Sequence, residues 1–126
     1  MEEYNEAIQV YEKAIELNPQ YYEAYNNLGV ALGKNEQYKE AIEAYNKAIS
    51  LKPDDAKVHN NMGSVLNVQG KRAEALVAYK RALAIKPDYA EAYNNVGGVL
   101  NVQGNSVEAL KAYKKALAIK PDYAQA

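Results

Sequence analysis

The sequence has 126 residues, of which 48% are hydrophobic and 25% are charged, and this length and composition predict a single globular domain. It contains no cysteine, which excludes disulfides, thiolate catalysis and cysteine-based metal sites. The net charge is −1, and because no apolar stretch approaches the roughly 18 residues of a membrane-spanning helix, we expect no membrane insertion.

Residues 1–21, MEEYNEAIQVYEKAIELNPQY, are predicted to form the first amphipathic helix. The segment begins with acidic residues, whereas a secretory signal peptide begins with basic residues and then becomes continuously apolar. We therefore predict no signal peptide, and a cytoplasmic location is the default expectation.

The rest of the chain is a set of internal repeats, marked at intervals of 34 residues by Pro19, Pro53, Pro87 and Pro121. The full units are residues 22–55, 56–89 and 90–123. Residues 1–21 match only the second half of a unit, and residues 124–126 begin a further unit. Together these segments predict one repeat domain that spans residues 1–126.

Each unit is predicted to form two helices. In the third unit, Tyr93, Val96 and Leu100 have the spacing of an apolar stripe on a first helix, and Gly104 suits the turn after it. The stripe of the second helix consists of Val107, Leu110, Tyr113 and Leu117. Proline disfavours α geometry in the residue before it, so Pro121 is expected to end this helix. Helices of about 14 residues are marginal alone in water, and the pairs must therefore stack.

The unit resembles the tetratricopeptide repeat, whose pattern is an aromatic residue, then Leu-Gly, and later Ala, an aromatic residue, Ala and Pro. The matching positions in chain order are Ala7, Tyr11, Ala14 and Pro19; Tyr25, Leu28, Gly29, Ala41, Tyr45, Ala48 and Pro53; His59, Met62, Gly63, Ala75, Tyr79, Ala82 and Pro87; and Tyr93, Val96, Gly97, Ala109, Tyr113, Ala116 and Pro121. The chain is similar to the superhelix of O-GlcNAc transferase-type and of bacterial and archaeal members of this family. The resemblance implies an all-α fold, a right-handed α-solenoid of antiparallel helix pairs, with first helices on the concave face and second helices on the convex face.

The glycine of the Leu-Gly pair is predicted to lie where the first helix meets the first alanine of the second helix, because small side chains allow two backbones to approach closely while aromatic neighbours fill the gaps. The predicted pairs are Gly29 with Ala41, Gly63 with Ala75, and Gly97 with Ala109.

Residues suited to catalysis or metal binding are scarce. His59 is the only histidine, and it occupies the position of Tyr25 and Tyr93 in the neighbouring units, so we expect a core side chain. A catalytic triad needs that histidine, and a zinc site has no credible ligand set. Gly97 and Gly98 lie within a helix and not in a phosphate-binding loop. We predict no enzyme activity, no metal and no cofactor.

Charge is distributed unevenly along the chain. Residues 1–55 carry 11 acidic and 5 basic side chains, whereas residues 56–126 carry 5 acidic and 10 basic ones, so the net charge changes from −6 to +5. This asymmetry either favours head-to-tail association or reflects which repeats are present. Basic pairs recur at Lys71-Arg72, Lys80-Arg81 and Lys114-Lys115, but no aromatic residues are interleaved with them, and we predict no nucleic-acid binding.

The exposed face of the first helices is the candidate binding surface, because amides and small apolar groups stand where long charged side chains usually cover a helix. The candidate residues are Asn26, Asn27 and Val30; Asn60, Asn61, Ser64, Asn67 and Val68; and Asn94, Asn95, Gly98, Asn101 and Val102. Gly33 and Lys34 continue this face in the first unit, and Glu23, Lys57 and Glu91 stand at its mouth.

An asparagine amide offers both donors and an acceptor to a peptide backbone. Asn27, Asn61 and Asn95 recur once per unit and resemble the asparagine ladder of the O-GlcNAc transferase superhelix. Alternatively, these asparagines and their neighbours hydrogen-bond adjacent helices and serve packing.

Two functions remain open at this point. The first is a non-catalytic scaffold that binds an extended peptide or partner segment on the concave face. The second is a structural solenoid that self-associates through its terminal helices, as a dimer or head to tail. An engineered or truncated array without a ligand of its own also fits.

Overall fold

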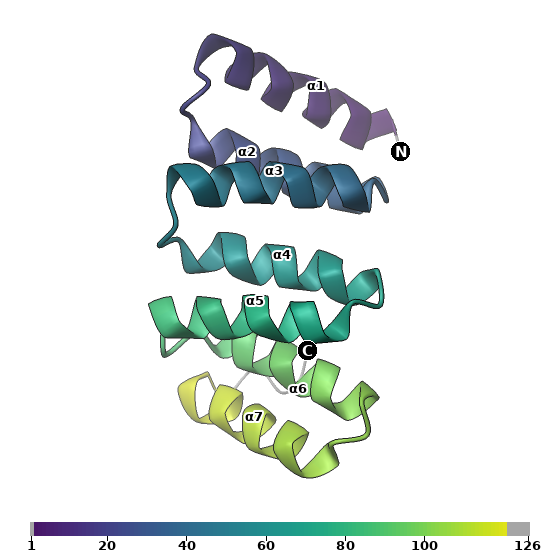
Figure 1. The fold of residues 1–126 in the computed structure, drawn as a ribbon, viewed down its shortest axis with the longest axis vertical. Helices are drawn as coiled ribbons and strands as arrows, with labels where there is room; N and C mark the ends of the chain where they lie inside the picture. Colours follow the sequence, from purple (N-terminus) through teal and green to yellow (C-terminus); the bar gives the residue numbers. More distant parts are fainter. Residues whose placement is uncertain (1, 121–126) are drawn as a thin grey trace.

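The computed structural model describes residues 2–120, which form a stack of seven α-helices (Figure 1). The helices are α1 (Glu2–Leu17), α2 (Tyr22–Lys34), α3 (Tyr38–Leu51), α4 (Ala56–Val68), α5 (Arg72–Ile85), α6 (Ala90–Val102) and α7 (Ser106–Ile119). No strand occurs in this described part, and the predicted all-α solenoid of helix pairs is confirmed. The predicted helix stop at Pro121 and the partial unit at residues 124–126 lie outside the described residues.

Prolines and glycines end the helices where the local rules predict. Helices α1, α3 and α5 each end before the Asn-Pro or Lys-Pro pair of their unit, and Lys52 before Pro53 is extended, with φ −145° and ψ 92°. The turn within a unit needs a left-handed residue, and Gly70 and Gly104 supply it with φ values of 81° and 84°. The first unit uses Glu36 with φ 64°, although side chains other than glycine rarely adopt this conformation.

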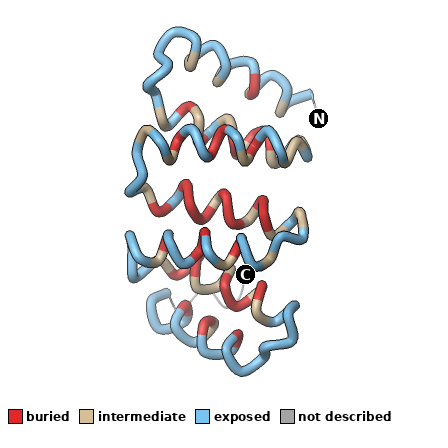
Figure 2. Tube along the Cα trace, in the orientation of Figure 1, coloured by how far each residue is buried: buried red, intermediate tan, exposed pale blue. Residues whose placement is uncertain are grey.

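The helices form two layers. Successive first helices contact one another, α2 with α4 and α4 with α6, whereas no contact of comparable extent joins successive second helices. Because the first helices approach one another more closely, α2, α4 and α6 form the inner, concave layer, and α3, α5 and α7 form the outer layer. Burial is greatest along α4, in the middle of the stack, and least along α1 and α7 (Figure 2).

The glycines of the first helices lie directly against tyrosine rings of the second helices. A Cβ atom on Gly29 would lie 2.6 Å from Cε1 of Tyr45. Gly63 has the same relation to Tyr79, and Gly97 to Tyr113. Each tyrosine ring therefore lies across the backbone of a first helix. The alanines Ala41, Ala75 and Ala109 are buried as well.

The second apolar stripe predicted in the third unit is largely exposed. Val107 and Leu110 are 67% and 54% exposed, and Leu117 is 37% exposed. The matching residues Leu76 and Leu83 of α5 pack against the core, because α6 covers them. No described helix covers that side of α7, and α7 buries only Ala109, Ala112 and Ala116.

Candidate functional site on the concave face

The structure divides the predicted concave residues into three groups by exposure. Asn27, Val68, Asn101 and Val102 are exposed. The half-buried group is Val30, Asn61, Ser64, Asn67, Asn94, Asn95 and Gly98. Asn26 and Asn60 are buried, at 9% and 1% exposure, and do not lie on the surface where we expected them. The accessible face is therefore narrower than the sequence indicates, and it centres on the second asparagine of each pair.

The buried asparagines link neighbouring repeats. Nδ2 of Asn61 donates a hydrogen bond of 3.2 Å to Oδ1 of Asn26, and Nδ2 of Asn95 donates one of 3.0 Å to Oδ1 of Asn60. Nδ2 of Asn60 lies 3.5 Å from the hydroxyl of Tyr89. Burying an amide without a partner is costly, and these bonds satisfy the buried acceptors of α2 and α4.

The same bonds orient the amides that remain at the surface. Asn61 and Asn95 each commit one N–H to the preceding repeat, which leaves the side-chain carbonyl and the other N–H available to a ligand. Asn27 is exposed, and no side-chain hydrogen bond joins it to another residue of the described part of the chain. The three equivalent asparagines thus differ in how firmly they are held.

Two tyrosines of the outer layer reach toward the concave face. The hydroxyl of Tyr79 lies 3.1 Å from Oγ of Ser64, and this serine donates to the carbonyl of Asn60 at 3.3 Å. Burial raises the pKa of Tyr79, and the hydrogen bond with Ser64 offsets this only in part. Burial also raises the pKa of Tyr45, so its hydroxyl stays protonated at neutral pH and remains a donor.

A pocket of about 230 Å³ opens on the concave face between α2 and α4. Its walls are Val30, Gly33, Lys34, Tyr38, Tyr45, Asn61, Ser64, Val65 and Val68. Sequence reasoning missed Tyr38, Tyr45 and Val65, because it placed apolar and aromatic residues in the core. The available signal was Gly33, since the other units have Asn67 and Asn101 at this position and a Cβ here would lie 3.3 Å from Val65.

His59 is a core side chain, as the sequence predicts. It is 5% exposed, and its Nε2 donates a hydrogen bond of 2.9 Å to the carbonyl of Pro53. Among residues 2–120, no cluster of histidine and carboxylate side chains could hold a metal ion. None of the helices in this range combines the length and the apolar character that crossing a membrane requires. The concave face offers hydrogen bonds and apolar contacts.

Comparison with protein families gives matches that together span residues 1–122. Models described as "Tetratricopeptide repeat" match residues 22–55 and 54–122, and one described as "TPR repeat" matches residues 1–36. None of the curated protein sequences matches this chain.

Solved structures with the same arrangement of helices include two crystal structures of MamA, each 32% identical in sequence, with TM-scores of 0.88 and 0.85. They cover 98% and 97% of this chain, which spans 72% and 67% of theirs. MamA 41-end from Desulfovibrio magneticus RS-1 is 20% identical and has a TM-score of 0.86 over 95% of this chain and 68% of its own, a likeness of fold alone.

Proposed function

Because the chain belongs to the tetratricopeptide repeat family, we propose that it is a non-catalytic scaffold that binds an extended peptide or partner segment along its concave face. One observation carries this proposal. Asn61 and Asn95 are held in a fixed orientation by hydrogen bonds to the preceding repeat, with free hydrogen-bonding groups at the surface. The family and the fold support a protein partner, and the asparagines support the mode of binding.

The asparagines would contact the backbone of the bound segment. Each amide can pair with the N–H and C=O of an extended peptide, and the repeat places one such amide on each first helix. Two of the three amides are already ordered, so binding costs little side-chain entropy at those positions. With about 1 kcal/mol from each hydrogen bond, this contact alone supports binding in the millimolar to high micromolar range.

The pocket between α2 and α4 would supply selectivity. Val30, Val65 and Val68 offer an apolar surface, and Tyr45, whose hydroxyl is a donor, lines the same pocket. An apolar side chain of the peptide, followed by a backbone carbonyl, fits this chemistry. Lys34 at the edge of the pocket favours an acidic residue nearby.

Panning of a random peptide library tests the proposal, followed by affinity measurements on single variants. Asn27→Ala and Val68→Ser change exposed groove residues, whereas Asn46→Ala changes an exposed asparagine of the outer helix α3 and serves as the control. We expect weaker binding for the first two, unchanged binding for the control, and equal unfolding midpoints for all three. A library without binders, or binders that ignore both groove substitutions, would contradict the proposal.

Self-association is the alternative function that a specific observation favours. Apolar side chains are exposed on α1, with Val10 at 64% and Leu17 at 76%, and on α7. The opposite net charges of the two halves would add attraction between copies. Light scattering across protein and salt concentrations tests this alternative, and a monomer under all conditions would exclude it.

A further inference from the structure

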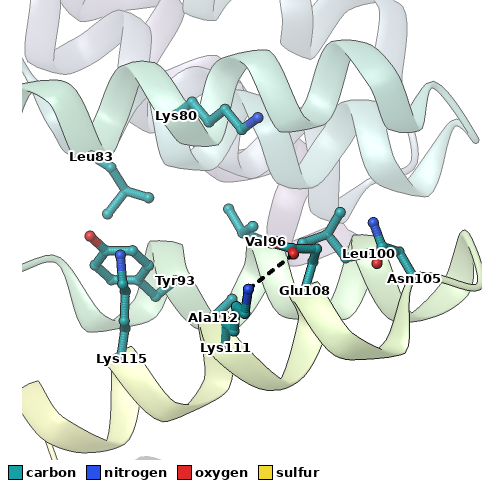
Figure 3. Close-up of a pocket in the computed structure, with 10 residues that line it drawn as sticks. All are labelled: Lys80, Leu83, Tyr93, Val96, Leu100, Asn105, Glu108, Lys111, Ala112 and Lys115. Carbon is teal, nitrogen blue, oxygen red and sulfur yellow. Dashed lines mark hydrogen bonds and ion pairs between the residues drawn. The ribbon is translucent and has the colours of Figure 1, made fainter.

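A second groove lies on the outer side of the stack, between α5 and α7, with α6 as its floor (Figure 3). Its volume is about 490 Å³. Leu83, Val96 and Leu100 line the bottom with aliphatic surface, and Lys80, Lys111 and Lys115 stand along the rims. We call this feature the basic groove.

The lysines of the basic groove are incompletely neutralised. Lys111 forms an exposed ion pair of 3.3 Å with Glu108 on its own helix. Nζ of Lys115 lies 5.5 Å from the ring centroid of Tyr93 and, within residues 2–120, has no carboxylate partner. Lys80 likewise forms no ion pair with any described residue. Glu108 also lines the groove and balances one of its three lysines, so two ammonium groups flank the aliphatic floor without a carboxylate partner of their own.

An equivalent groove two repeats earlier has the opposite charge. It lies between α1 and α3, has a volume of about 380 Å³, and is again floored by aliphatic residues, here of α1 and α2. Glu12 stands at the position of Lys80 and Glu43 at that of Lys111, whereas Lys47 has the same charge as Lys115 at the third position. Since the two floors are alike, charge distinguishes the grooves, and each is expected to select partners of opposite sign.

We propose that the basic groove docks an acidic segment of a protein partner that inserts an apolar side chain between α5 and α7. Lys80 and Lys115 attract the carboxylates, and the side chain covers Leu83 and Leu100. The aliphatic floor favours a peptide over a nucleic acid, whose sugar and phosphate groups gain nothing from it. This surface is separate from the concave face, and the inference does not depend on the proposed peptide groove.

The test uses a fluorescent synthetic peptide of twelve residues, composed of Glu and Asp around one central Leu, in anisotropy titrations at low and moderate salt. The variant Lys80→Glu/Lys115→Glu changes the basic groove. The control Arg81→Glu/Lys114→Glu makes the same change of charge at adjacent exposed positions of α5 and α7. We expect binding to weaken about tenfold or more in the groove variant, and much less in the control. Equal losses in both would show diffuse attraction and overturn the proposal.

Two further arms test the floor and the charge separately. Replacing the central Leu of the peptide by Ser should weaken binding several-fold, and unchanged binding would mean that the floor is not used. The variant Glu12→Lys/Glu43→Lys gives the groove between α1 and α3 the same charges as the basic groove. Each protein molecule should then bind two peptides instead of one. Absence of peptide binding to the unmodified protein, or tighter binding of a (dT)12 oligonucleotide lost in Lys80→Glu/Lys115→Glu, would also overturn the proposal.

Discussion

Asn95 of α6 donates a hydrogen bond of 3.0 Å from its Nδ2 to Oδ1 of Asn60 on α4, and Asn60 is 1% exposed. The same relation joins Asn61 to Asn26 one repeat earlier. The two adjacent asparagines of α4, Asn60 and Asn61, thus have different roles. One member is buried as an acceptor, and the other links back to the preceding repeat while remaining at the concave surface.

Replacing Asn60 by Ala is expected to lower the free energy of unfolding by about 1–3 kcal/mol, because Asn95 loses its acceptor and the hydroxyl of Tyr89 loses a nearby amide. A double-mutant cycle with Asn95→Ala, measured by urea unfolding, should give a coupling energy of about 0.5–1.5 kcal/mol. Asn94→Ala is the control, since Asn94 occupies the equivalent position in α6 and is only half-buried. Strict additivity would show that the bond contributes nothing.

The neighbouring glycines of α6 should respond oppositely to alanine. A Cβ on Gly97 would lie 2.6 Å from the ring of Tyr113, so Gly97→Ala should destabilise the protein by about 1–3 kcal/mol. At Gly98 the nearest atom is the hydroxyl oxygen of Tyr113, at 3.9 Å. Gly98→Ala should therefore stabilise the helix by about 0.5–1 kcal/mol. Thermal unfolding of the two variants compares them, and similar melting temperatures would refute the close contact with Tyr113.

Protein stability should increase when the left-handed residue in the turn between α2 and α3 is replaced by glycine. Glu36 has φ 64°, a conformation that glycine adopts without strain, so Glu36→Gly should raise the free energy of unfolding by up to about 1 kcal/mol. The reverse change, Gly70→Ala, should destabilise, although no described atom lies within 4 Å of the added Cβ. Chemical denaturation measures both effects. A loss of stability in Glu36→Gly would mean that the glutamate side chain stabilises this turn.

Alkaline pH should destabilise the fold through its buried tyrosines. Burial raises the pKa of Tyr45 and of Tyr79, whereas a tyrosine in the unfolded chain ionises near pH 10. The unfolded state therefore loses its protons first, and the free energy of unfolding should fall as pH rises above about 10. Urea midpoints between pH 8 and 11 measure this decline. Tyr45→Phe should reduce its slope, whereas Tyr21→Phe, at an exposed position, should not.

Several features of the fold follow from local rules and could be predicted. The helix pairs follow from three features of the sequence: the interval between prolines, the apolar stripes and the turn glycine at residue 104. The stripes and the turn glycine depend on backbone geometry over a few residues. At the glycines of the first helices, the sequence indicated a close approach but not which aromatic residue lies there. A small residue signals a close approach, but it does not reveal that the ring of Tyr45 fills the space beside Gly29.

By itself, the sequence determined the repeat period, the pairing of helices and the stacking, because each depends on periodicity and on the conformational limits of proline and glycine. Only the tertiary structure decided which of two adjacent asparagines is buried, since Asn60 and Asn61 are identical in type and differ only in the direction that each faces on α4. It also decided that Tyr45 reaches the concave pocket and that lysines of α5 and α7 share one groove. These relationships join residues on different helices, and the packing of those helices sets them.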